Sequence, residues 1–64
     1  MEIQYINCDN GANITIKNPY TEIKLENIHA IKIYKDEISF YRKNTTYGLY
    51  DLISEFKGSF YMNF

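Results

Sequence analysis

Residues 30–43 read AIKIYKDEISFYRK, in which apolar residues alternate with polar ones on both sides of a central Lys-Asp pair. This alternation is typical of two half-buried strands joined by a tight turn. If the turn is centred on the Lys-Asp pair, Ile33 lies opposite Ile38 and Ile31 lies opposite Phe40. Because successive side chains of a strand point to opposite faces, these apolar pairs share one face. The stretch therefore predicts an antiparallel hairpin with one buried face.

The same register places two tyrosines of the hairpin on its other face. Tyr34 then pairs with Glu37, and Tyr41 pairs with Ala30. Each cross-strand pair of this hairpin would add a few tenths to about 1 kcal/mol of stability. We therefore expect these two rings outside the core.

Turn signals divide the chain before this hairpin. Residues 8–11 (CDNG) predict a tight hairpin turn after a first strand, because Asp, Asn and Gly tolerate positive backbone angles. Residues 12–17 then alternate as a second strand, and residues 18–21 (NPYT) predict a turn with proline in its second position. The alternation changes phase within residues 27–30, which predicts a turn or a β-bulge there.

The periodicity changes after the hairpin. Four apolar residues follow the spacing i, i+3, i+4, i+7, namely Leu49, Leu52, Ile53 and Phe56. This spacing predicts an amphipathic helix at about residues 46–57, with Gly58 beyond its end. The closing SFYMNF returns to alternation and predicts a C-terminal strand.

Together these patterns predict an α+β fold. We expect a small antiparallel sheet of five to six short strands, which is either strongly twisted or half-closed. One helix (about residues 46–57) would pack on one face, and a C-terminal strand would follow. The 64 residues form a single compact domain over residues 1–64, and the hydrophobic fraction of 45% is high enough for a core of its own.

Composition excludes several classes of protein. Seven basic side chains against eight acidic ones leave a net charge of -1, which disfavours both a nucleic-acid binder and a nucleic-acid mimic. The single cysteine and single histidine, Cys8 and His29, are too few for a disulfide scaffold or a structural zinc site. Asp51 and Glu55 would share a face of the expected helix, where we interpret them as a solvated surface. We therefore predict a non-enzyme with no catalytic residues, no metal and no cofactor.

The tyrosines are the unusual feature, because there are seven of them and no tryptophan. The expected registers place Tyr34, Tyr41 and Tyr61 on the outer face of the sheet, and Tyr47 and Tyr50 on a flank of the helix. Interfaces are enriched in tyrosine, which combines a large contact area with a hydroxyl group. We predict that these five residues bind a partner. The alternative is that the chain comes from an AT-rich genome, whose codons favour Ile, Lys, Asn and Tyr. The tyrosine rings would then only lie over the strands and shield their edges.

Three functional hypotheses follow from these observations. The first is a protein-binding module that docks on a larger protein; its size and AT-rich composition suggest a phage or mobile-element inhibitor of a host defence or nucleic-acid-processing protein. The second is a homodimeric structural or regulatory protein that associates through the tyrosines or the last strand. The third is weak binding of single-stranded nucleic acid by the Lys32–Lys43 hairpin, which carries Lys35 and Arg42 as well. No long apolar run or signal peptide is present, so we expect a cytoplasmic protein (the host cytoplasm, if phage-encoded) without membrane contact.

Overall fold

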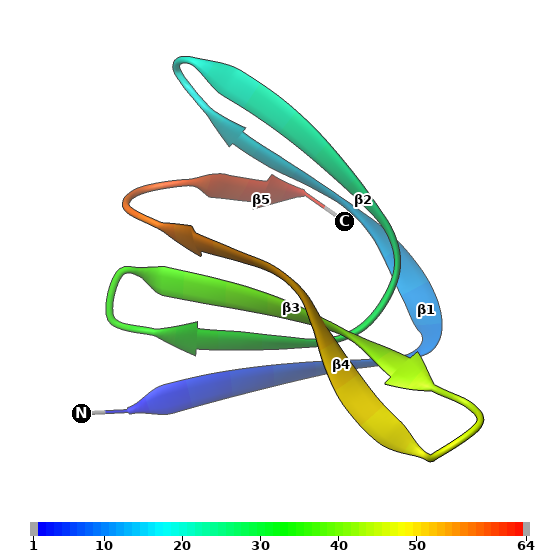
Figure 1. Ribbon diagram of the computed structural model, residues 1–64. Helices are drawn as coiled ribbons and strands as arrows, with labels where there is room; N and C mark the ends of the chain where they lie inside the picture. Colours follow the sequence, from blue (N-terminus) through cyan, green and yellow to red (C-terminus); the bar gives the residue numbers. More distant parts are fainter. Residues whose placement is uncertain (1, 64) are drawn as a thin grey trace.

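The computed structural model describes residues 2–63, which form five strands in one antiparallel sheet (Figure 1). The strands are β1 (Ile3–Asn18), β2 (Thr21–Tyr34), β3 (Glu37–Asn44), β4 (Leu49–Lys57) and β5 (Tyr61–Asn63). Their order in the sheet is β4-β3-β2-β1-β5, so four strands form a meander and β5 returns to pair with β1. Residues 2–63 contain no helix, and so none long and apolar enough to span a membrane. The predicted α+β class is wrong, because the described chain is all-β.

The β2–β3 hairpin has the register that its alternation predicts. Ile33 lies opposite Ile38, Ile31 lies opposite Phe40, and the outward pairs also match. The connection is the two-residue turn Lys35–Asp36, in which Lys35 adopts a positive φ of 56°. Such a turn matches the twist of antiparallel strands even without glycine. The hairpin prediction is therefore confirmed.

The helix predicted for residues 46–57 is wrong, because this segment contains β4, which pairs with β3 along its whole length. The pairing slips once: Phe40 lies opposite Ser54, whereas Tyr41 lies opposite Leu52. One extra residue, Ile53, therefore sits in β4 as a bulge.

This bulge explains why β4 resembles a helix in sequence. An extra residue reverses which positions face the core, so Leu52 points outward with Tyr41 while Phe56 points inward with Ile38. The two apolar residues have the same parity but opposite orientations, and the interrupted alternation imitates a helical repeat. In addition, a helix as short as the predicted one is marginal alone in water.

The CDNG segment is also not a hairpin turn, because it lies inside the 16-residue strand β1. Asn7 pairs with Ala30 and Ala12 pairs with Ile28. Residues 8–11 therefore form a large bulge opposite a single residue of β2. Gly11 permits this conformation with a φ of 79°. The flexible composition of CDNG indicates an irregular backbone, but a bulge satisfies it as well as a turn.

Two other irregularities were predicted correctly. The register shifts again between Ala12 and Ile14, where Asn27 of β2 has a positive φ of 56°, which confirms the bulge expected within residues 27–30. The turn after β1 is confirmed too. There the Asn18 side-chain oxygen accepts hydrogen bonds from the backbone N–H groups of Tyr20 and Thr21, at 2.8 Å and 2.9 Å.

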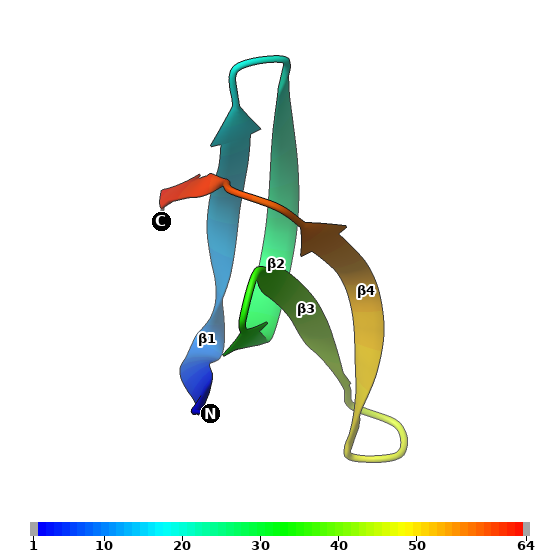
Figure 2. The same ribbon diagram turned by 90° about the vertical axis from the view of Figure 1, so that its left-hand side faces the viewer.

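The bulges bend β1 and β2, and the sheet curls around a small core (Figure 2). The fully buried apolar side chains are Ile14, Ile16, Ile28, Ile31 and Phe40. Half-buried side chains pack against them from the later strands, including Phe56, Phe60 and Met62. These phenylalanines face inward as expected, while Phe64 lies outside the described residues.

Arg42 links β3 to β2 by hydrogen bonds beyond the point at which the two strands stop pairing. Its guanidinium donates hydrogen bonds to the backbone carbonyls of Glu26 (Nη2 to O, 2.6 Å) and Asn27 (Nε to O, 3.2 Å). These carbonyls belong to the half of β2 that pairs only with β1. All strands formed by residues 2–63 belong to this one sheet, so no further layer from these residues covers its convex outer face.

Candidate functional site: an outer tyrosine face

The strand registers bring tyrosines from separate strands together on the convex face. Tyr5 of β1 lies beside Lys32 of β2, one row from Ala30 and Tyr41. Tyr50 of β4 lies opposite Lys43, in the next row of the same face. Because directly opposed residues in antiparallel strands point to the same side, all three rings project outward.

These rings surround a shallow hollow of about 400 Å³. The residues lining it are Tyr5, Asn7, Ala30, Tyr41 and Tyr50. The small side chain of Ala30 leaves the space between the rings. Tyr5 is 66% exposed and Tyr50 is 51% exposed, whereas Tyr41 is half-buried between them. The hollow is therefore an open apolar depression edged by phenol groups.

Further apolar side chains extend this surface on both sides. We define the tyrosine face as these outward residues: Ile3, Tyr5, Ala30, Tyr34, Tyr41, Tyr50 and Leu52. Leu52 of β4 is 54% exposed and Ile3 of β1 is 48% exposed, so both sides of the face carry exposed aliphatic groups.

The charges around the tyrosine face are of both signs. Glu37 and Lys57 form an exposed ion pair at 3.3 Å between carboxylate and ammonium. The Lys35 ammonium lies 5.4 Å from the centre of the Tyr34 ring. Lys32 and Glu55 flank Ser39 in one row, and the small Ser39 side chain is buried. The row of Lys32, Ser39 and Glu55 therefore lies between Tyr34 and the hollow, and neither sign of charge dominates the face.

No protein-family model, curated protein sequence or solved structure matches the chain. The functional argument consequently depends on the geometry of this face. Its residues can be compared directly with those expected from the sequence.

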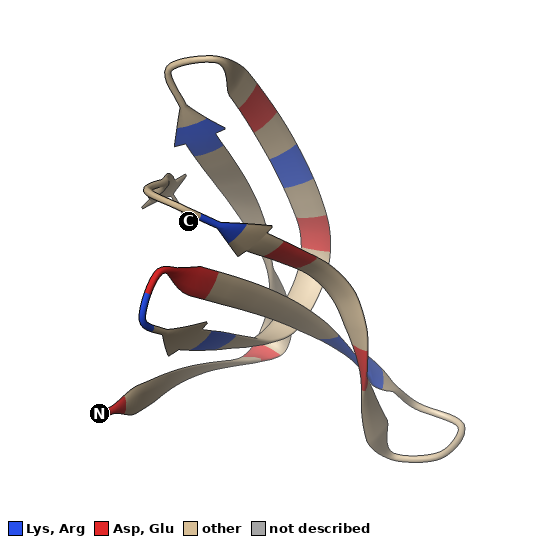
Figure 3. Cartoon of the chain, turned by 60° about the vertical axis from the view of Figure 1, so that its left-hand side comes forward, with Lys and Arg blue, Asp and Glu red and all other residues tan. Residues whose placement is uncertain are grey.

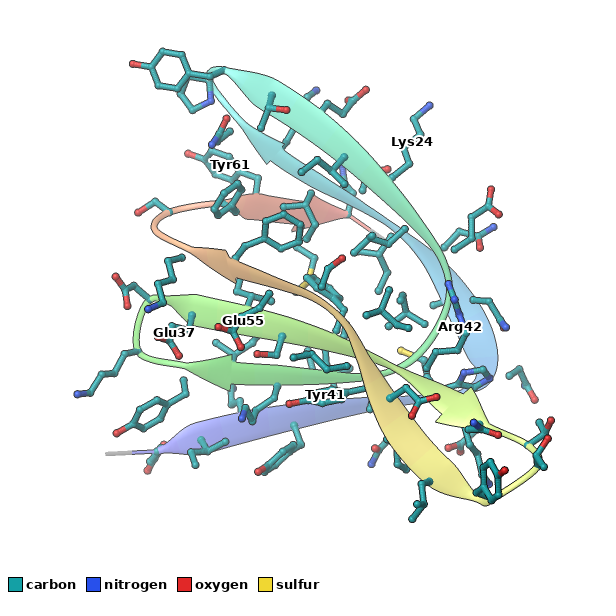
Figure 4. All side chains as sticks on the ribbon, viewed as in Figure 1. Lys24, Glu37, Tyr41, Arg42, Glu55 and Tyr61 are labelled. Carbon is teal, nitrogen blue, oxygen red and sulfur yellow. The ribbon has the colours of Figure 1, made fainter. Side chains whose placement is uncertain are left out.

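Three of the five predicted partner-binding residues lie on the tyrosine face: Tyr34, Tyr41 and Tyr50. Tyr50 was expected on a helix flank and reaches the face through β4 instead. The other two lie elsewhere. Tyr47 is 75% exposed in the turn between β3 and β4. Tyr61 is 81% exposed on β5, beside Lys17 and apart from Tyr41 (Figure 4).

Tyr61 lines a different hollow, of about 570 Å³, between the strand-connecting turns. Turn residues such as Pro19, Asp36 and Gly58 line it, together with the apolar residues Ile33, Ile38 and Phe60. No second tyrosine lines it, so Tyr61 does not act together with the tyrosine face.

Sequence reasoning missed Tyr5, which contributes the most exposed ring of the hollow. The alternation at the start of β1 indicated a strand. This signal was sufficient to predict that Tyr5 and Ile6 point to different faces of the sheet. Its position next to Lys32 depends on the pairing of residues 3–7 with β2. The interpretation of CDNG as a hairpin turn concealed that pairing.

The basic residues of the β2–β3 hairpin do not form one cluster. The guanidinium of Arg42, labelled in Figure 4, donates hydrogen bonds to β2 carbonyls. The Lys35 ammonium lies over the Tyr34 ring. Only Lys32 and Lys43 share the outer face, separated by the row of Tyr41. A continuous basic track along stacking rings, as single-strand binding requires, is not assembled by these residues.

The polar groups considered for catalysis are also separated. Cys8 is half-buried against the core, while the His29 Nδ1 accepts a hydrogen bond from the Lys43 backbone N–H at 3.2 Å. In the strand register Asp51 lies opposite Arg42 and Glu55 lies opposite Ser39, which places the two carboxylates on opposite faces of the sheet. Residues 2–63 contain no group of three or more potential metal-binding side chains.

Proposed function

We propose that the chain is a non-enzymatic protein-binding module that docks on a larger protein through the tyrosine face. The observation that supports this proposal is the convergence of three tyrosines, from three strands, on one open hollow. Tyrosine contributes a large contact area at low cost in side-chain entropy, and its hydroxyl needs a hydrogen-bonding partner. Both properties suit a protein surface.

The shape and charge of the face favour a protein over a nucleic acid. Nucleic acid requires several cations along its backbone, whereas the face here combines Lys32 and Lys57 with Glu37 and Glu55. A hollow edged by phenol hydroxyls fits an apolar side chain that projects from a surface rich in backbone carbonyls. That the partner is a host defence or nucleic-acid-processing protein, and the chain a phage or mobile-element inhibitor, stays a prediction from size and composition.

The first prediction concerns capture of partners by a variant carrying Tyr41→Ser and Tyr50→Ser. We expect the recovery of specific partners from a bacterial lysate to fall at least about tenfold, because truncating buried aromatic contacts typically costs more than about 1 kcal/mol each. Quantitative mass spectrometry of the captured proteins would measure this ratio against the wild type.

The matched control carries Tyr20→Ser and Tyr47→Ser, which removes two exposed tyrosines from turns outside the face. It is expected to recover the same partners as the wild type. Thermal unfolding followed by circular dichroism would first establish that both variants fold. Equal recovery by both double variants would contradict the proposal.

A further inference from the structure

The first half of β1 is an unpaired sheet edge with an unusual composition. Residues 3–7 pair with β2 on one side, and β5 pairs only with residues 15–17 on the other. Among residues 2–63, no other strand joins this half of β1. Its backbone N–H and C=O groups on the outer side are therefore available to a further strand.

Natural sheets usually protect such edges with charges, bulges or covering groups. The free edge of β4 carries Asp51, Glu55 and Lys57, and a bulge interrupts it. The free half of β2 carries three charged residues within 21–27, and Arg42 occupies two of its carbonyls. Both edges therefore resist the addition of a strand.

Residues 3–7 of β1 have none of these protections, since the bulge of β1 begins only at Cys8. Residues 3–8 read IQYINC and carry no charge, and Figure 3 shows this segment in tan between acidic positions at its two ends. The edge is also bordered by exposed apolar side chains, since Ile3 is 48% and Tyr5 is 66% exposed. An extended, uncharged edge with exposed apolar groups beside it is suited to pairing with another strand.

We propose that this edge pairs with the same edge of a second copy of the chain, antiparallel and symmetric about Tyr5. In this register Tyr5 lies opposite the second copy's Tyr5, and Ile3 lies opposite the second copy's Asn7. Gln4 lies opposite the second copy's Ile6. No charged residues oppose each other, and each exposed Ile3 lies diagonal to the second copy's Tyr5. The edge is therefore complementary to itself, which an isologous dimer requires.

The symmetric pairing also determines where the tyrosine faces lie. A two-fold axis perpendicular to the sheet keeps the convex side of both copies on the same side. The two tyrosine faces then adjoin along the Tyr5 pair and form one continuous surface. The dimer does not depend on the proposed docking function, because it uses the backbone edge of β1 rather than the hollow.

The register can be tested with two double variants that share one substitution. Ile3→Lys with Asn7→Lys places lysines directly opposite each other twice in the dimer. Ile3→Lys with Asn7→Glu places a lysine opposite a glutamate at the same two positions. Both sites are exposed in the single chain, so the effects on folding are matched.

We expect light scattering coupled to size-exclusion chromatography to give a wild-type mass approaching twice 7.6 kDa as the concentration rises. The Lys/Lys variant is expected to weaken the dimer at least about tenfold relative to the Lys/Glu variant, because like charges opposite each other repel. A wild type that stays monomeric at every concentration would overturn the proposal. So would equal dissociation constants for the two variants.

Discussion

Phe40→Ala is expected to leave most of the chain unfolded at room temperature. The Phe40 side chain is fully buried in β3, opposite Ile31, and its ring makes an edge-on contact with Phe56 at 6.0 Å between ring centres. Removing a buried phenylalanine typically costs about 3–5 kcal/mol through lost burial and the cavity left behind. A core in a domain of this size rarely supplies more than about 3–5 kcal/mol in total. Urea titration followed by circular dichroism would measure the loss.

Leu52→Ala is the control that separates the observed strand from the expected helix. In an amphipathic helix packed on the sheet, Leu52 would belong to the buried stripe, and its truncation would cost about 2–5 kcal/mol. In β4 it is 54% exposed on the convex face, so the change is expected to stay within about 0.5 kcal/mol of the wild type. A cooperative Phe40→Ala protein with a wild-type midpoint would contradict the assignment of the core.

These two residues also show what the sequence could and could not predict about the fold. Phe40 lies in a stretch where alternation continues unbroken on both sides of a two-residue turn, so local pattern and tertiary pairing agree. Leu52 lies next to a bulge, where one extra residue reverses the faces of the strand. Periodicity alone cannot distinguish a reversed strand from a short helix, because both depart from strict alternation in the same way. Pairing with β3 determines that this segment is a strand, and this pairing depends on the whole sheet and not on local sequence.

The candidate site was predictable to a similar extent. Tyr34 and Tyr41 were placed correctly on the outer face, because their orientation follows from the hairpin register. Tyr5 was missed, and Tyr50 was assigned to the wrong element, because their neighbours depend on β1–β2 and β3–β4 pairings that contain bulges. The gathering of the three rings around Ala30 is thus a consequence of irregular pairing, which no local pattern encodes.

Gly11→Ala is expected to destabilise the chain by about 2–3 kcal/mol, which is less than Phe40→Ala but large for one methyl group. Gly11 has a φ of 79°, and a side chain in this left-handed conformation costs about 1–2 kcal/mol. A Cβ atom at this position would also overlap the side-chain oxygen of Asn27. Because the Asn27 amide is exposed and can swing away, we assign the lower end of the usual overpacking cost, about 1 kcal/mol. Thermal unfolding would measure the sum.

Gly48→Ala separates the two contributions, since Gly48 has a similar φ of 70° but no atom within 4 Å of the added methyl group. It should therefore show the conformational cost without the overlap. Combining Gly11→Ala with Asn27→Gly removes the overlapping amide, and glycine tolerates the φ of 56° at position 27. A double-mutant cycle is then expected to give a coupling of about 1 kcal/mol between the two sites. Strict additivity would mean that the bulges of β1 and β2 do not contact each other. In that case the bend of the sheet at these bulges would have another cause.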